Sequence, residues 1–200
     1  MIADQGEYAQ ASALEEEALA IFRMLGDQAG IVRLSLNMGT DAYDQGNYDR
    51  ATTLLEEAIS LGRSVGSWHS VAYALNNLAL VELERQEYER AEMLQAEALD
   101  LWQDLGNEVG IADCFENFAM FRVAQHESEL AARLFGAAHA LRAPTGVPGR
   151  PGDREYLARF ISAARTDLGE ARFAAAWEQG EAMPLDDAIA HALGEERGRP

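Results

Sequence analysis

Apolar residues recur through the first 142 residues at steps of three and four, the spacing of one face of an α-helix. In the first such segment these positions are Tyr8, Ala11, Leu14, Ala18, Ile21, Phe22 and Leu25. A second segment, residues 28–44, places Ile31, Leu34, Ser35, Met38 and Ala42 on one side. Glycine-containing turns separate such segments, so the pattern predicts short connections between antiparallel α-helices.

The same pattern returns at a constant interval of 40 residues. The aligned sets are Tyr8, Tyr48 and Tyr88; Ala11, Ala51, Ala91 and Ala131; Leu14, Leu54, Leu94 and Leu134; Ala18, Ala58, Ala98 and Ala138; and Gly26, Gly66 and Gly106. A fixed period of 20 to 50 residues is typical of stacked helical units. The sequence therefore predicts an all-α fold, a right-handed α-solenoid with units at about 1–25, 28–65, 68–105 and 108–142.

The two ends of the chain do not follow the 40-residue repeat. Residues 1–7 end in the turn Gln5-Gly6-Glu7, so the first unit lacks nearly all of its first helix, as expected of a piece cut from a longer chain or of a helix that packs alone. Residues 143–152 are rich in Pro and Gly and are expected to form an exposed loop. Helices over 154–168, 170–182 and from Pro184 to Leu193 are expected to cap the stack, within residues 153–193. Residues 194–200 are expected to be a disordered tail.

Composition narrows the classes of partner. The chain has 34 acidic and 16 basic residues, a formal net charge of −18, and every basic residue is Arg. A field this negative repels nucleic-acid phosphates and anionic membranes, so we expect no direct nucleic-acid binding and no membrane contact. The N-terminus lacks the charged and apolar regions of a signal peptide, and a cytoplasmic location is expected.

The residues that carry catalysis in other proteins are scattered here. His69, His126, His139 and His191 show no metal-ligand spacing, and a chain without Lys has no phosphate-binding Gly-x-x-x-x-Gly-Lys loop. Cys114, the single cysteine, stands at helical spacing from several Phe residues and is expected to be buried. We expect no enzymatic activity, no metal and no cofactor.

The motif Gly46-Asn47-Tyr48-Asp49-Arg50-Ala51, with Ala58 after it, resembles the tetratricopeptide repeat. The 40-residue period and the run Ala74-Leu75-Asn76-Asn77-Leu78-Ala79 are similar to the long-helix subtype found in kinesin light chains and bacterial regulators. The C-terminal runs Ala132–Ala138, Leu168–Phe173 and Ala176–Gly180 resemble the end of large ATP-binding LuxR-type bacterial transcriptional regulators. The resemblance implies a sensor or protein-contact segment. It carries over neither ATPase nor DNA-binding activity.

Three amides also keep the period: Asn37, Asn77 and Asn117. In tetratricopeptide repeats this face of the first helix lines a concave groove. Arg33, Tyr73 and Asn76 are expected on the same face. An amide can both donate to and accept from a peptide backbone, so these six residues are the candidate binding site. The alternative is that the amides satisfy neighbouring helices.

Two functional hypotheses follow. The first is an interaction module that binds a protein, a peptide or an effector in the groove, with basic or neutral ligands favoured by the acidic field. The second is a structural spacer or oligomerisation segment of a larger multidomain ATPase regulator. The exposed half-unit at the N-terminus would allow a homodimer of two-fold symmetry.

Overall fold

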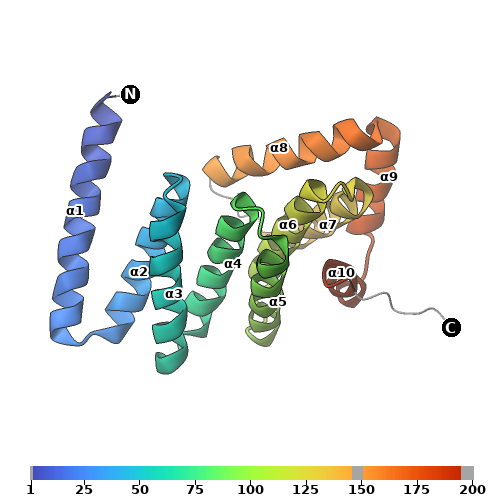
Figure 1. Ribbon diagram of the computed structural model, residues 1–200. Coiled ribbons are helices and arrows are strands. Elements are labelled where there is room, and N and C mark those ends of the chain that lie inside the picture. Colours follow the sequence, from blue (N-terminus) through green and yellow to red (C-terminus); the bar gives the residue numbers. More distant parts are fainter. Residues whose placement is uncertain (1, 146–150, 195–200) are drawn as a thin grey trace. The chain divides into compact units, whose positions relative to one another are not determined.

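The computed structural model describes residues 2–145 and 151–194, and every regular element within those ranges is helical (Figure 1). The helices are α1 (Ile2–Leu25), α2 (Gln28–Asp44), α3 (Tyr48–Val65), α4 (Trp68–Glu84), α5 (Tyr88–Asp104), α6 (Glu108–Ala124), α7 (Ser128–Arg142), the short 3₁₀ helix η1 (Ala143–Thr145), α8 (Pro151–Leu168), α9 (Glu170–Glu181) and α10 (Leu185–Ala192). The predicted all-α fold of the α-solenoid class is confirmed.

The chain divides into two compact units, residues 1–87 and 88–200. In the first, α2 packs between α1 and α3, and α3 packs against α4. Apolar side chains of three helices meet in a buried cluster of Leu19, Ile31, Met38 and Leu54. The helical spacing placed Ile31, Met38 and Leu54 on inner faces, and these three residues are buried. On α1 the prediction is wrong, since the predicted Leu14, Ile21 and Leu25 are exposed and the buried residue is Leu19.

In the second unit α7 is the central helix, because α6, α8, α9 and α10 all pack against it. The backbones of α7 and α9 come close enough to exclude a side chain. A Cβ atom added to Gly180 would overlap the backbone carbonyl of Arg133, and one added to Gly136 would overlap that of Trp177. Two glycines therefore set the distance between these helices.

Every turn between the repeated helices contains a residue in the left-handed backbone region. These residues are spaced by 20 and stand at positions 26, 46, 66, 86, 106 and 126, with φ between 63° and 73°. Glycine occupies four of them, whereas Gln86 and His126 adopt this conformation despite their side chains. The amide of Gln86 donates to Leu83 O at 2.9 Å, just as Gly46 N donates to Tyr43 O at 2.8 Å. The turn at 125–128, which departs from the sequence motif, therefore keeps the geometry of the others.

The two ends of the chain differ from expectation. The predicted turn at Gln5-Gly6-Glu7 is wrong, since α1 runs without a break from Ile2 to Leu25. One glycine inside a helix costs only about 1 kcal/mol, which the surrounding helix-favouring residues offset. The loop expected over residues 143–152 contains η1, and α8 begins at Pro151, where the fixed φ of proline suits a first helical residue. Residues 195–200 of the predicted tail lie outside the described residues.

Candidate functional site

Four of the six candidate residues lie at equivalent places on the neighbouring helices α2 and α4 of the first unit. Arg33 and Asn37 on α2 are exposed, and Tyr73 and Asn77 on α4 are half-buried. We call these four residues the amide face. The buried side of α2 is formed by residues such as Ile31 and Met38, so helical spacing turns positions 33 and 37 outward.

Asn77 joins the two helices of the amide face. Its Nδ2 donates to Thr40 Oγ1 at 2.9 Å, and the Thr40 hydroxyl donates to Leu36 O at 3.0 Å. One side of this amide is therefore engaged within the protein. Asn37 is exposed, whereas Asn76 is only 4% exposed and lies inside the unit. Asn37 is accordingly the amide that a ligand reaches most directly.

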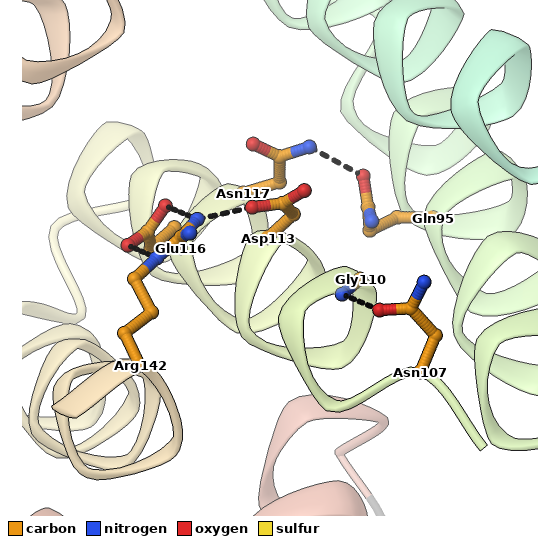
Figure 2. Close-up of polar contacts among 7 residues, drawn as sticks. All are labelled: Gln95, Asn107, Gly110, Asp113, Glu116, Asn117 and Arg142. Atoms are coloured by element: carbon orange, nitrogen blue, oxygen red, sulfur yellow. Dashed lines mark hydrogen bonds and ion pairs between the residues drawn. The ribbon is translucent and has the colours of Figure 1, made fainter. Parts of the chain in front are cut away.

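The third amide of the series, Asn117, lies in the second unit and is 7% exposed. Its Nδ2 donates to the Oε1 of Gln95, a fully buried side chain of α5, at 2.9 Å (Figure 2). A buried amide needs such a partner, because an unsatisfied one costs about 1–3 kcal/mol. Asn117 is therefore bonded to the neighbouring helix α5.

Beside Asn117, the residues equivalent to Tyr73 and Asn76 are two acids, Asp113 and Glu116. Figure 2 shows Arg142, from the end of α7, pointing at both. Its Nε and Nη2 donate to the two carboxylate oxygens of Glu116 at 2.8 and 2.9 Å, and Nη2 also contacts Asp113. The chain thus places its own cation on the part of the second unit that corresponds to the amide face.

Electrostatics keep the Arg142 guanidinium charged. Burial alone lowers the pKa of Arg142, but hydrogen bonds and charges from Glu116 and Asp113 outweigh burial and hold that pKa above its ordinary value. Sequence reasoning missed Arg142. The available indication was that two acids three residues apart on a buried helix require a nearby positive charge.

Catalytic chemistry finds no support in the described ranges. Cys114 is fully buried, and burial raises the pKa of its thiol well above the ordinary value, so it is a poor nucleophile. Among residues 2–145 and 151–194, no group of three His, Cys, Asp or Glu side chains is arranged to hold a metal ion. None of the helices in those ranges has the length and apolarity to cross a bilayer.

Similarity to known proteins agrees with the fold. Residues 36–65 and 71–105 match the model of the tetratricopeptide repeat family. The structure is similar to the crystal structure of BtubC (BKLC) from P. vanneervenii, with a TM-score of 0.66 and 22% sequence identity over 99% of this chain and 79% of that chain. At this identity the likeness shows the shared fold. No curated protein sequence matches the chain.

Proposed function

We propose that these tetratricopeptide repeats make the chain a non-enzymatic protein-interaction module that binds a peptide or a partner protein through the amide face. One observation carries the proposal. Arg33 and Asn37 are exposed on the amide face, whereas the equivalent region of the second unit is occupied by Arg142. Repeats of this family serve as protein-binding scaffolds.

The chemistry of the amide face suits an extended backbone. An exposed amide such as Asn37 can donate to a carbonyl and accept from an N–H, and the half-buried ring of Tyr73 offers an apolar contact. Tyr73 is braced by His69, with ring centroids 5.1 Å apart. A preformed surface of this kind avoids part of the ordering cost of binding.

The negative charge of the chain favours basic ligands over acidic ones. The whole chain carries −18, and α2 itself ends with the exposed acids Asp41 and Asp44 beyond the single cation Arg33. This field accelerates the encounter with basic segments and disfavours acidic ones. We therefore propose a basic or neutral protein segment as the ligand.

We further propose that the module is the regulatory segment of a bacterial transcriptional regulator and acts in the cytoplasm. The support is the resemblance of Ala132–Ala138 and Ala176–Gly180 to the end of LuxR-type regulators. In such a protein this acidic segment would contact protein, and DNA would be bound elsewhere.

A second candidate, the structural spacer, is favoured by a different observation. Asn77 and Asn117 both donate to side chains of neighbouring helices, Thr40 and Gln95. Two of the three periodic amides are therefore used in holding helices together. Under this hypothesis the amide face binds no ligand.

Peptide selection on the purified chain distinguishes the two. We expect a displayed random-peptide library to yield peptides with basic or neutral side chains, and Asn37→Ala to weaken their binding at least about tenfold, equivalent to about 1.4 kcal/mol. Gln103→Ala, which truncates an exposed amide on α5, is the matched control and should bind as the wild type does.

Asn37 is a sharper probe than Asn77, since Asn77→Ala also removes the hydrogen bond to Thr40 and should lower stability by about 1 kcal/mol. If the library yields no peptide, the spacer hypothesis is favoured. Peptides whose affinity is unchanged in Asn37→Ala would place the site elsewhere.

A further inference from the structure

The two helices of the amide face both end in an exposed acid. Asp44, the last residue of α2, lies two turns beyond Asn37 on the same side of the helix. Glu84, the last residue of α4, stands in the same relation to Asn77. The hydrogen bond from Asn77 to Thr40 holds the helices side by side one turn before Asp44. We call Asp44 and Glu84 the acidic pair, and it continues the amide face at the C-terminal ends of α2 and α4.

This position is unfavourable for the acids themselves. The last carbonyl groups of a helix carry partial negative charge, so they repel a carboxylate and favour a cation. Neither α2 nor α4, which the structure describes in full, has a basic residue in its last turn. Arg85, the residue after α4, donates instead to Asp49 of α3 at 2.5 Å. Residues placed against local stability are frequently functional, so a ligand role for the acidic pair accounts for its position.

Two tyrosines lie beside the acidic pair. The Tyr48 hydroxyl donates to the carboxylate of Glu84, and burial, then the charge and the hydrogen bond of Glu84, raise the pKa of Tyr48. A neutral hydroxyl leaves the negative charge of Glu84 in place. The ring centroid of Tyr43, the residue before Asp44, is 6.0 Å from that of Tyr48, and both rings are half-buried. Aromatic rings and carboxylates both attract cations, so this end of the face suits a basic side chain.

The second unit shows how acids on the equivalent part of the fold bind a cation. There Arg142 donates through Nε and Nη2 to Glu116 and contacts Asp113. Ala124 stands at the position equivalent to the acidic pair, and α6 carries Arg122 in its last turn. The acidic pair is therefore a property of the unit whose amide face is exposed.

We propose that the acidic pair binds a lysine or arginine side chain of the partner segment and thereby fixes the direction in which that segment lies on the amide face. This inference rests on the proposed function. Neighbouring packed helices lie about 8–10 Å apart, so one cation between the two helix ends can approach both carboxylates. Near the other end of α2, the exposed Arg33 repels a second cation. Arg33 and Asp44 are about 16 Å apart along the helix, the length of about five extended residues.

Peptides selected from the displayed library test this direction. We expect them to share Lys or Arg at one fixed position, and changing that peptide residue to Gln should weaken binding about tenfold. Asp44→Asn with Glu84→Gln should weaken binding of the basic peptide by a similar factor and should no longer distinguish it from the Gln peptide. The Gln side chain still accepts a hydrogen bond from Tyr48. Glu17→Gln, which neutralises an exposed acid on α1, is the matched control for Glu84→Gln and should leave binding unchanged.

Exchange of charge separates a binding role from a structural one. A peptide with Glu at the basic position should bind Glu84→Arg about tenfold more tightly than it binds the wild type. The melting temperature of Glu84→Arg should be at least that of the wild type, because a cation suits a helix C-terminus. A lower melting temperature with no change in peptide preference would assign Glu84 a structural role and overturn the proposal.

The remaining outcomes distinguish this inference from the proposed function. Peptides that depend on Asn37 but show no preferred basic position would overturn the role of the acidic pair and leave the proposed function standing. Equal weakening by Glu17→Gln and Glu84→Gln would also overturn that role, since the charge of the whole chain would then attract the peptide. A library that yields no peptide would overturn both.

Discussion

The backbone contact between α7 and α9 makes Gly180→Ala a strong test of the second unit. The Cβ of alanine would lie 2.7 Å from the carbonyl carbon and 2.9 Å from the Cα of Arg133, with the carbonyl oxygen closer still. All three are backbone atoms of a helix packed on four others, so no side-chain rotation relieves the overlap. The carbonyl oxygen is the nearest of the three atoms, so an ordinary contact of about 3.4 Å requires the helices to separate by more than about 1 Å.

Two opposing effects of Gly180→Ala determine the change in the free energy of unfolding. Alanine gains about 1 kcal/mol over glycine from helix propensity. A separation of even 0.5–1 Å forfeits about a quarter to a half of the dispersion energy at each affected contact, and overpacking typically costs about 1–3 kcal/mol or more. The cluster of Ala132, Phe173 and Ala176 shares this interface. We expect a net loss of about 2 kcal/mol, or roughly 8 °C in the melting temperature of a unit of this size.

Urea unfolding followed by circular dichroism measures the loss, and hydrogen exchange of α9 amides locates it in the second unit. Gly62→Ala in α3 is the control: its Cβ would approach a methyl of Val71 at 2.8 Å, with every other neighbour at 3.6 Å or beyond. This neighbour is a side-chain methyl rather than helix backbone, so the loss of stability should be smaller than that of Gly180→Ala. A Gly180→Ala variant as stable as the wild type, with unchanged α9 protection, would refute the close approach of the two backbones.

Two further predictions concern a turn and a buried thiol. Gln86 holds a φ of 63°, so Gln86→Gly should raise the free energy of unfolding by about 0.5–1 kcal/mol, whereas Gln103→Gly within α5 should lower it by a similar amount, both measured by urea unfolding. Burial raises the pKa of Cys114 above the ordinary value of 9.0, so the unfolded chain loses this proton at lower pH than the folded chain does. The contribution of the protonated Cys114 thiol to the free energy of unfolding is therefore complete below about pH 9 and is lost as pH rises further. The wild type should lose more stability than Cys114→Ala between about pH 7.5 and 10, and parallel pH profiles of the urea midpoint would contradict this.

The helices of the repeats were predictable because two regularities coincide, the 3.6-residue helical period and the 40-residue repeat. Cys114 was placed correctly in the core by its spacing from the Phe residues of α6. The turns at Gln86 and His126 were harder, since neither residue is a typical left-handed one. Their conformation follows from the helices on either side, which must reverse at the same interval as those around Gly46.

The exposure and hydrogen-bond partners of the three periodic Asn side chains were not predictable from the sequence. The same residue type at the same repeat position has different neighbours in each unit. Asn37 is exposed, while Asn117 is buried beside Gln95. Arg142 was missed for the same reason, since it lies at the end of α7, 26 residues from Glu116, outside any motif. The contact of Gly180 with Arg133 joins α7 to a helix outside the repeat, where no period links one sequence position to another.

The left-handed residues at intervals of 20 have a consequence for engineering. Each marks a turn at which one helix ends and the next begins with the same backbone geometry. The segment between two such turns can therefore be exchanged as one unit. A second copy of residues 47–86, inserted directly after position 86, should add one helix pair to the array. The turns on either side should keep their geometry. The number of inserted helix pairs would then set the length of the repeat array and the area of its surface.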